Sequence, residues 1–269
     1  MKTKFWKYDG AGNDFVLLDC RGTNFEPSER ALRAICARRT GIGADGAMIL
    51  SDSEVADFRM RYYNADGREG TMCGNGGRCI AWFADLLGVG GDEKRFEAID
   101  GLHTATVLAR QGNCATIRLG MKDVAEVSVD PEGDVLLDTG SPHLVRVVES
   151  LDMDVVGEGA ALRYGPKTAA TNGANINFVT VLGEGEVALR TYERGVEDET
   201  LACGTGATAT AIAICHVMQP NVRHFKLHAR GGDLEVEFVR TAEGYYTDVW
   251  LTGPARLVFE GEVEWCNFE

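Results

Sequence analysis

Proline and long hydrophobic runs are scarce in this chain of 269 residues. Six prolines stand beside 33 glycines, a balance typical of short strands and tight turns rather than of a helical bundle. No stretch approaches the roughly 20 apolar residues that cross a bilayer, and the N-terminal MKTKFWKYDG lacks the apolar segment of a signal peptide. We therefore expect a soluble, cytoplasmic protein with no membrane partner.

Positive charge is also in short supply. Lysine and arginine number 27 against 41 aspartates and glutamates, which gives a formal net charge of −14. Such a surface repels phosphate backbones, so the composition argues against nucleic-acid binding. It does not exclude a small anionic ligand, because local groups govern the field inside a cleft.

Patterns that hold metals or common cofactors are missing. The eight cysteines show no CxxC pair and no cysteine–histidine cluster with zinc spacing, and they are too sparse for a disulfide scaffold. No pyridoxal-phosphate lysine motif or nucleotide loop is evident. We expect free thiols without metal or cofactor, and we assign six of them to packing: Cys20, Cys36, Cys79, Cys114, Cys215 and Cys266.

Segments with a period of two dominate what is present. Alternation of this kind indicates half-buried strands, and it occurs at residues 57–63, 104–108, 225–228, 234–239 and 258–263. Three segments look helical: one from residue 27 or 28 to residue 39, one after the glycines at 74–76 and one after those at 204–206. The pattern predicts a strand-rich α+β protein.

An internal repeat organises these segments. Residues 59–81 and 188–211 each contain an Arg-x-Tyr strand, a polar turn, and a Cys-Gly-x-Gly sequence that opens a helix with small residues. The two cysteines, Cys73 and Cys203, lie 130 positions apart, close to half the chain. This order predicts two halves of similar structure with one thiol each.

The Cys-Gly-x-Gly sequence suits acid–base chemistry. The first amides of a helix have no partner within it, and the helix dipole places partial positive charge there. A cysteine at that position has its thiolate stabilised, and glycine leaves the amides open to a carboxylate. Two such thiols on opposite sides of an α-carbon could remove a proton from one face and supply one to the other.

Other uses of two cysteines remain open at this point. A redox pair would not need the glycines, and a cysteine hydrolase would need one thiol with a histidine rather than two matching thiols. A protein that only binds a carboxylate would need the glycines without the cysteines. The repeat therefore favours a racemase or an epimerase.

Eight short blocks give the chain a specific resemblance. They follow one another between residues 10 and 206: Gly10-Ala-Gly-Asn-Asp-Phe15, Gly41-Ile-Gly-Ala-Asp45, Asn64-Ala-Asp-Gly67, Cys73-Gly-Asn-Gly-Gly-Arg78, Gly140-Ser-Pro-His143, Asn175-Ile-Asn-Phe178, Tyr192-Glu-Arg-Gly195 and Ala202-Cys-Gly-Thr-Gly206. In content and order they resemble the diaminopimelate epimerase family. The resemblance implies interconversion of LL- and meso-diaminopimelate, a step toward lysine.

The resemblance also implies a fold. It predicts two pseudo-symmetric, strand-rich domains, each wrapped around a central helix, with the active site in the cleft between them. We expect one domain at residues 1–114, with a strand at 256–269 returning to it, and the other at residues 115–255. Members of the family work without metal or pyridoxal phosphate and form homodimers.

Site residues follow from the resemblance, motif by motif. Cys73 and Cys203 would exchange the proton. The backbone amides of Gly74, Asn75, Gly204 and Thr205 would bind the α-carboxylate, Asn13 and Glu193 the α-ammonium group, and Asn64, Asn175 and Arg194 the distal end of the substrate. His143, with Glu193, would lie beside the thiols and tune them.

Three positions depart from the family pattern. Ser141 stands where asparagine is frequent, Asp9 where histidine is common, and Gly46 where some members have glutamine. None of them removes a thiol or Arg194. Proline or hydroxyproline racemases also use paired cysteines, but proline has no distal amino-acid end for Arg194 to bind. A catalytically silent ligand-binding relative would not need both cysteines.

Overall fold

The chain divides into two compact units. The computed structural model describes residues 2–265 and residue 268. An N-terminal unit comprises Met1–Leu119 and Gly253–Glu269, and a C-terminal unit comprises Gly120–Thr252. Cys266, which we assigned to packing, lies outside the described residues.

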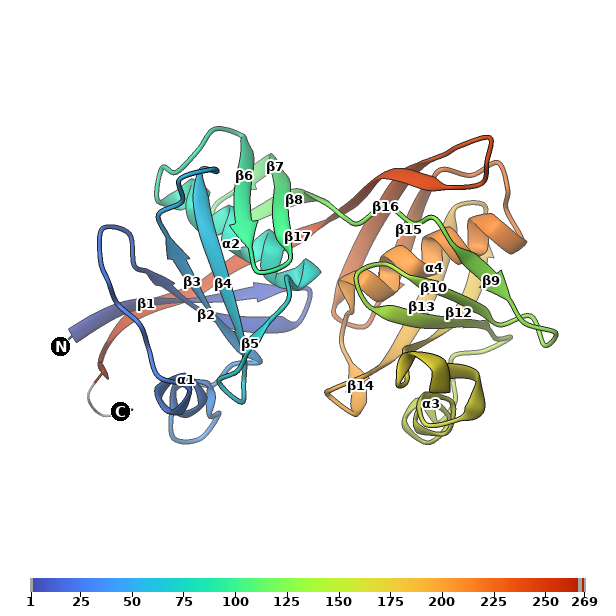
Figure 1. Cartoon of the computed structure of the whole chain (residues 1–269), viewed down its shortest axis with the longest axis horizontal. Coiled ribbons are helices and arrows are strands. Elements are labelled where there is room, and N and C mark those ends of the chain that lie inside the picture. Colours follow the sequence, from blue (N-terminus) through green and yellow to red (C-terminus); the bar gives the residue numbers. More distant parts are fainter. Residues whose placement is uncertain (1, 266–267, 269) are drawn as a thin grey trace. The chain divides into compact units, whose positions relative to one another are not determined.

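Strands make up most of both units (Figure 1). Those of the N-terminal unit are β1 (Lys2–Gly10), β2 (Asn13–Asp19), β3 (Gly46–Ser51), β4 (Phe58–Asn64), β5 (Glu69–Gly70), β6 (Glu93–Ala98), β7 (Gly101–Gln111) and β8 (Cys114–Gly120). Those of the C-terminal unit are β9 (Val127–Val129), β10 (Val135–Asp138), β11 (Pro142–Val147), β12 (Asn175–Gly183), β13 (Glu186–Glu193), β14 (Asp198–Thr200), β15 (His224–Ala229) and β16 (Gly232–Arg240). Strand β17 (Tyr246–Glu264) contributes to both units.

Helices are few. They are α1 (Glu29–Cys36), α2 (Gly74–Leu86), α3 (Val155–Arg163) and α4 (Gly204–Val217), with a 3₁₀ helix, η1 (Pro166–Thr171). No helix formed by residues 2–265 and 268 is long and apolar enough to span a membrane. The strand-rich α+β class predicted from the sequence is confirmed.

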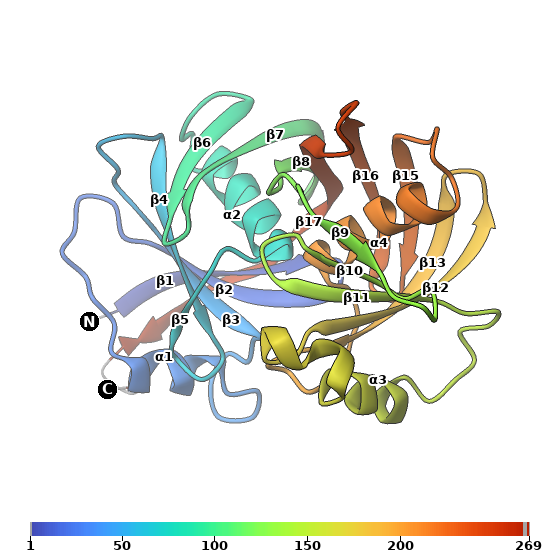
Figure 2. The same ribbon diagram turned by 45° about the vertical axis from the view of Figure 1, so that its right-hand side comes forward.

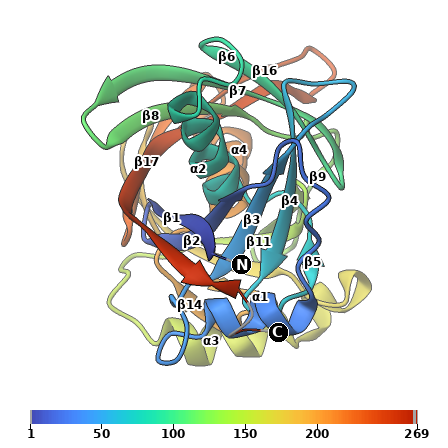
Figure 3. The same ribbon diagram turned by 90° about the vertical axis from the view of Figure 1, so that its left-hand side faces the viewer.

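The strands of the N-terminal unit close into a ring around α2 (Figure 3). From β1 the ring runs to β2, β3 and β4, on to β6, β7 and β8, and returns through β17. The β2–β3 and β4–β6 pairs are parallel and the others are antiparallel. Helix α2 packs against β1, β2, β3 and β7, so strands enclose it.

The C-terminal unit repeats this order around α4 (Figure 2). Strands β11 and β12 are parallel, β12 and β13 antiparallel, β13 and β15 parallel, and β15 and β16 antiparallel. The short β14 pairs with β13 as β5 pairs with β4. The predicted internal repeat is therefore confirmed, since the same sequence of pairings recurs in both units.

The strand register shows which residues of the N-terminal unit correspond to which residues of the C-terminal unit. Phe15 and Gly46 form the first pair of the parallel β2–β3 ladder, and His143 and Asn175 form the first pair of the parallel β11–β12 ladder. Phe15 in one unit therefore corresponds to His143 in the other, and Gly46 corresponds to Asn175.

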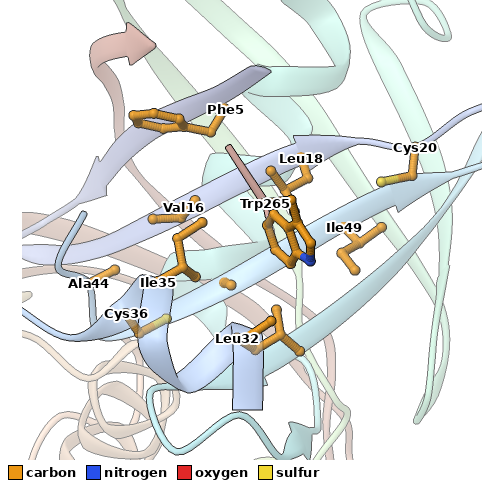
Figure 4. Packing of buried hydrophobic residues seen from close by; sticks show 12 residues of the cluster. Phe5, Val16, Leu18, Cys20, Leu32, Ile35, Cys36, Ala44, Ile49 and Trp265 are labelled. Carbon is orange, nitrogen blue, oxygen red and sulfur yellow. The ribbon is translucent and has the colours of Figure 1, made fainter. Parts of the chain in front are cut away.

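Helix α1 covers the outer side of the N-terminal sheet (Figure 4). Its N-cap is Ser28, whose Oγ accepts a hydrogen bond from the Ala31 amide at 3.1 Å. The helix ends at Cys36, three residues earlier than predicted. The amides of Ile42 and Gly43 both donate to the Ile35 carbonyl, at 2.9 and 3.1 Å, so the chain turns back at that point.

The two enclosed helices begin earlier than the sequence suggested. Cys73 is the N-cap of α2 and Cys203 that of α4, so the glycines that were expected to precede each helix form its first turn. Residues 74–84 of α2 are all buried, as are 206–215 of α4. Small side chains fit this location, because strands surround each helix and leave it no polar face.

A fourth helix, α3, was not predicted. Its N-cap is Asp154, whose Oδ1 accepts from the Gly157 amide at 3.0 Å. Two glycines within the helix weaken the pattern that would have indicated it. Helix α3 lies between β11 and β12 in the chain, as α1 lies between β2 and β3, and it packs against β12, β13 and β14.

Candidate active site

The first candidate half-site surrounds Cys73. Its thiol is partly exposed at the start of α2. The first hydrogen bond within the helix runs from the Gly77 amide to the Cys73 carbonyl at 2.6 Å. The amides of Gly74 and Asn75 precede that bond, so they cannot be satisfied inside the helix. A helix start of this kind attracts a carboxylate.

Asn13 lies against this thiol. Its Oδ1 is 3.7 Å from Cys73 Sγ and 3.4 Å from Asn75 Nδ2. Its own amide nitrogen donates to Asp45 Oδ2 at 2.7 Å. The start of β2 and the start of α2 therefore bring together three residues that the sequence separates by up to 62 positions.

A charged network supports Asn13 from behind. The buried Lys7 ammonium lies 2.6 Å from Asp14, and Arg38 bridges Asp14 and Asp45 at 2.8 and 2.5 Å. Burial alone would raise the pKa of Asp14, but the hydrogen bonds from Arg38 and Lys7 lower that pKa to about 2. The Asp14 carboxylate is thus ionised, and its ion pairs hold the loop before β3 in place.

Arg78 lies entirely buried one turn into α2. Its guanidinium donates to Asn75 Oδ1 at 2.8 Å, to the Gly74 carbonyl at 3.2 Å and to the Pro254 carbonyl at 3.3 Å. Burial lowers its pKa. The side chain therefore fixes which way the Asn75 amide points.

The second candidate half-site surrounds Cys203. Its side chain is buried, and its Sγ accepts a hydrogen bond from the Gly206 amide at 3.4 Å. Thr205 Oγ1 lies at the same distance from the sulfur. The first bond within the helix runs from the Ala207 amide to the Cys203 carbonyl at 2.9 Å. The amides of Gly204 and Thr205 precede it, as Gly74 and Asn75 do in the other unit.

A buried polar layer lies beneath the start of α4. His143 Nε2 is 3.0 Å from Ser141 Oγ, and His143 Nδ1 is 3.1 Å from Asn177 Nδ2. Thr191 donates to Asn177 Oδ1 at 2.9 Å, and Ser141 donates to Thr205 Oγ1 at 3.4 Å. Burial lowers the pKa of His143 to about 3, so the imidazole is neutral at physiological pH.

The corresponding layer of the N-terminal unit is largely apolar. By the register of the strands, Phe15 occupies the place of His143, Met48 that of Asn177, and Tyr62 that of Thr191. The rings of Phe15 and Tyr62 pack edge to face, 6.1 Å apart. The two thiols therefore share a backbone setting but not a side-chain environment.

Arg194 and Asn175 are held together next to Glu193. The Arg194 amide donates to Asn175 Oδ1 at 2.8 Å, and Arg194 Nη1 donates to the carbonyls of Thr171 and Gly173, each at 3.2 Å. Glu193 is the last residue of β13. These contacts fix the guanidinium at the end of the strand.

Asn64 occupies in the N-terminal unit the place of Glu193. It is exposed at the end of β4, where its backbone closes a turn with Gly67 and Arg68 at 2.9 Å each. The C-terminal unit thus gathers the predicted residues His143, Asn175, Arg194, Cys203 and Thr205, and the N-terminal unit gathers Asn13, Cys73, Gly74 and Asn75.

The three departures from the family pattern have local explanations. Asp9 accepts from the Gly12 amide at 2.7 Å and supports the turn between β1 and β2. A Cβ atom at Gly46 would lie 2.7 Å from Tyr62 Cε2, so the tyrosine fills the space of any side chain there. Ser141 bonds to protein groups of the polar layer.

Several residues of these half-sites were missed in the sequence analysis. Asn177 and Thr191 lie in the polar layer, Asp45 orients Asn13, and Tyr62 lies against Gly46. Asn177 shares a strand face with Asn175, since alternate residues point the same way. That spacing was a signal for Asn177, whereas the contact of Asp45 depends on pairing between β2 and β3.

Four of the remaining cysteines occupy packing positions, and Cys114 is only partly buried. The seven cysteines that the structure describes form no disulfide with one another, and Cys20, Cys36, Cys79 and Cys215 are buried. Burial raises the pKa of each of these four, that of Cys20 to about 11 and that of Cys36 to about 12. Such thiols stay protonated and unreactive.

One acidic group among the described residues has the spacing of a cation site. Asp130, Glu132 and Asp134 present oxygens within 4.8 Å of one another. The Lys167 ammonium already lies 2.5 Å from Asp130 and 2.7 Å from Glu132, and Arg146 pairs with Asp134 at 2.5 Å. These cations neutralise the carboxylates, so the group is a set of ion pairs in the β9–β10 turn.

Comparison with known proteins decides the family. The family model described as diaminopimelate epimerase matches residues 5–123 and 135–258. The chain belongs to the diaminopimelate epimerase family. A member from Flavobacterium psychrophilum is 46% identical over 96% of this chain and 98% of its own, and one from Chlorobaculum tepidum is 41% identical over 94% and 98%.

Solved structures extend the likeness beyond the diaminopimelate epimerase family. A phenazine biosynthesis protein of the PhzF family from Bacillus anthracis has a TM-score of 0.77 at 17% identity, covering 98% of this chain and 99% of its own. A hydroxyproline epimerase from Agrobacterium vitis has a TM-score of 0.71 at 17% identity, covering 97% and 92%. At such identities the likeness concerns the fold alone.

Proposed function

We propose that this chain interconverts LL- and meso-diaminopimelate, a step in lysine biosynthesis, by exchanging the α-proton between two cysteines. It is an isomerase of the diaminopimelate epimerase family. The two-thiol assignment rests on one observation. In each unit a cysteine is the N-cap of the glycine-rich helix that the strands enclose. Neither cysteine is needed for the capping alone, since serine or aspartate caps better.

The α-carboxylate would bind at the helix starts. The amides of Gly74 and Asn75 in one unit and of Gly204 and Thr205 in the other precede the first intrahelical bond. When the α-proton leaves, negative charge spreads onto the carboxylate as it becomes enolate-like. Donors fixed in place before the reaction stabilise that charge without reorganisation.

The two thiols would then act as base and acid. A thiolate removes the proton from one face of the α-carbon, and the second thiol donates a proton to the other face, which inverts the centre. Sulfur and backbone amides supply both parts of this chemistry, so the proposed route requires neither metal nor pyridoxal phosphate.

Side chains would recognise the two ends of diaminopimelate. Asn13 Oδ1 points toward Cys73, where it could accept from the α-ammonium group together with the Glu193 carboxylate. The Arg194 fork, with Asn175 and Asn64, would bind the distal amino-acid end, because guanidinium pairs with carboxylate in a bidentate geometry. His143 would act on the thiols through its neighbours.

Exchange of the α-proton tests the proposal. LL-Diaminopimelate, and separately L-proline as a matched control, would be incubated in deuterated water with reduced protein and followed by NMR. We expect deuterium incorporation with inversion for diaminopimelate alone, abolished by Cys73→Ala and by Cys203→Ala. Exchange with proline alone would assign the chain to the other substrate, and full activity of either variant would overturn the two-thiol mechanism.

We further propose a homodimer located in the cytoplasm. Reactive thiols remain reduced in that compartment, which this chemistry requires. Light scattering on the eluting protein tests the dimer, and fractionation of the source cells tests the location.

A further inference from the structure

The hydrogen bonds around the two thiols have opposite directions. Cys203 Sγ accepts from the Gly206 amide and so caps its own helix, whereas the Cys73 side chain makes no capping bond to α2. The difference is notable because the backbone of the two helix starts repeats. It arises in the side chains that surround each sulfur.

In the polar layer of the C-terminal unit, the structure determines which atom donates and which accepts in each hydrogen bond. Asn177 Nδ2 donates to the Leu144 carbonyl at 3.2 Å, which orients the amide. The same nitrogen faces His143 Nδ1 at 3.1 Å. Since an amide nitrogen only donates, Nδ1 is the acceptor, and the proton of the neutral imidazole lies on Nε2. His143 Nε2–H therefore donates to Ser141 Oγ at 3.0 Å.

This order continues to the sulfur. Ser141 Oγ also accepts from Asn175 Nδ2 at 3.1 Å, and Asn175 is oriented by the Arg194 amide on its Oδ1. With both lone pairs engaged, the Ser141 hydroxyl donates to Thr205 Oγ1 at 3.4 Å. The Thr205 hydroxyl is then directed to Cys203 Sγ at 3.4 Å. In this series of hydrogen bonds, from His143 through Ser141 and Thr205, each donor points toward Cys203 Sγ.

Around Cys73 the order is reversed. Asp45 is the acceptor for Asn13 Nδ2, so the other end of the amide, Oδ1, faces Cys73 Sγ at 3.7 Å. Arg78 orients Asn75 in the same manner, and Asn75 Nδ2 donates to Asn13 Oδ1. An oxygen acceptor beside sulfur favours an S–H donor and repels a thiolate.

Charged groups on each side oppose or neutralise one another. Arg78 would favour a Cys73 thiolate, but its donors are directed to Asn75, Gly74 and Pro254. The Asp45 and Asp14 carboxylates, paired with Lys7 and Arg38, and the Asp9 carboxylate lie on the Cys73 side. On the Cys203 side, Asp138 and Arg194 act with opposite sign on the neutral His143.

We propose that in the ligand-free protein Cys203 is the thiolate and Cys73 the thiol, and that Ser141 and Thr205 are positioning residues that impose this order. The inference deepens the proposed function and rests on it, since it assigns the base and the acid of that reaction. In a turnover that begins with the isomer whose α-hydrogen faces Cys203, the Cα–H bond breaks toward Cys203 and a new Cα–H bond forms from Cys73. The negative charge then lies on Cys73, and the initial state returns by proton exchange.

Alkylation of the ligand-free protein tests the assignment. Iodoacetamide reacts with thiolates, and peptide mass spectrometry gives the rate at each cysteine as a function of pH. Normalising each rate to its plateau removes the difference in exposure between the two sulfurs. We expect the midpoint of the pH dependence of the alkylation rate to lie at least about one pH unit lower for Cys203 than for Cys73. Equal midpoints, or the opposite order, would overturn the assignment.

Variants of the hydroxyl chain test the positioning residues. Ser141→Ala and Thr205→Val should each raise the Cys203 midpoint by about half a pH unit or more, while Thr205→Ser restores it. Thr139→Val is the matched control, because the Thr139 hydroxyl donates to the Thr205 carbonyl rather than into the chain. If Ser141→Ala and Thr205→Val leave the alkylation midpoint of Cys203 unchanged, the two hydroxyl groups do not position its thiolate.

The two proposals can fail separately. Alkylation needs no substrate, so the expected midpoints without exchange of diaminopimelate would refute the proposed function alone. Exchange of diaminopimelate with equal or reversed midpoints would refute the protonation assignment alone.

Discussion

Asn13 Nδ2 donates to Asp45 Oδ2 at 2.7 Å, and this bond decides which atom of Asn13 faces Cys73. An amide has a donor end and an acceptor end, so an anion bound to the donor end directs the oxygen toward the thiol. Asp45 is itself held by Arg38. A residue outside the predicted site thus orients one of the predicted site residues.

We expect Asp45→Asn to lower kcat/KM for diaminopimelate about 10- to 100-fold, the equivalent of one hydrogen bond to a charged group. The neutral amide can present its own donor to Asn13, so the orientation of Asn13 is no longer fixed. Steady-state epimerisation measures the effect. Asp52→Asn, which changes an aspartate that binds the Gly22 amide in an exposed loop, should leave the rate unchanged. A wild-type rate in Asp45→Asn would contradict the orienting role.

Arg194 provides a test of recognition at the distal end. Two backbone carbonyls and the bond between its amide and Asn175 hold it in place. Lysine keeps the charge but loses the fork, so Arg194→Lys should raise KM about 10- to 100-fold with a smaller change in kcat. Arg163→Lys, at a nearby arginine bonded to Asn172, is the matched control. An unchanged KM would remove Arg194 from the distal site.

The repeat supplies a matched pair of glycines. A Cβ atom at Gly206 would lie 2.4 Å from Asn177 Oδ1, whereas one at Gly76 would lie 3.2 Å from the flexible Met48 Sδ. We expect Gly206→Ala to lower the free energy of unfolding by about 1–3 kcal/mol and Gly76→Ala by clearly less. Urea unfolding of both variants measures this. Equal losses of stability would mean that Asn177 moves away from an added Cβ atom as easily as the Met48 side chain does.

Much of this architecture was predictable because it is repeated. The order of strand, turn, cysteine and helix is visible twice in the sequence, and it predicted two similar halves. Helix α3 was missed because its two glycines obscure the helical pattern. The repeat itself offered a signal, since α1 connects β2 to β3 and its counterpart had to connect β11 to β12.

The side-chain layers beneath the thiols could be predicted only in part. Sequence motifs selected His143 and Asn175, and alternation along β12 extends the polar face to Asn177. The contrast with Phe15 and Met48 depends on strand register, which brings together residues far apart in the chain. The direction of each hydrogen bond depends further on backbone carbonyls such as that of Leu144, and no motif contains that information.

His143 gives the protein a specific sensitivity to acid. Burial lowers its pKa to about 3, against an ordinary value of 6.5 in the unfolded chain. Between these values the unfolded state binds the additional proton, so stability falls as pH falls through this window. The loss between pH 7 and pH 5 is about 2 kcal/mol for this one group.

Other groups titrate in different ways. The pKa of Asp14 is lowered to about 2, so the carboxylate adds a loss only below pH 3.8. The pKa of His228 is raised by Glu186 and Asp233, so its contribution is present at low pH and is lost as pH rises, opposite in sign to that of His143. The contributions of Asp14 and His228 are the same in wild type and in a His143 variant. They therefore cancel when the change in unfolding free energy between pH 7 and pH 5 is compared between the two proteins.

We therefore expect His143→Gln to flatten the dependence of unfolding free energy on pH between 7 and 5 by about 2 kcal/mol, even where the variant is less stable at neutral pH. Urea unfolding at a series of pH values measures the slope. His224→Gln, at an exposed histidine beside Glu235, controls for the loss of a histidine as such. The same slope in His143→Gln and wild type would mean that the imidazole binds its proton in the folded protein, and the donor order toward Cys203 would then lose its starting point.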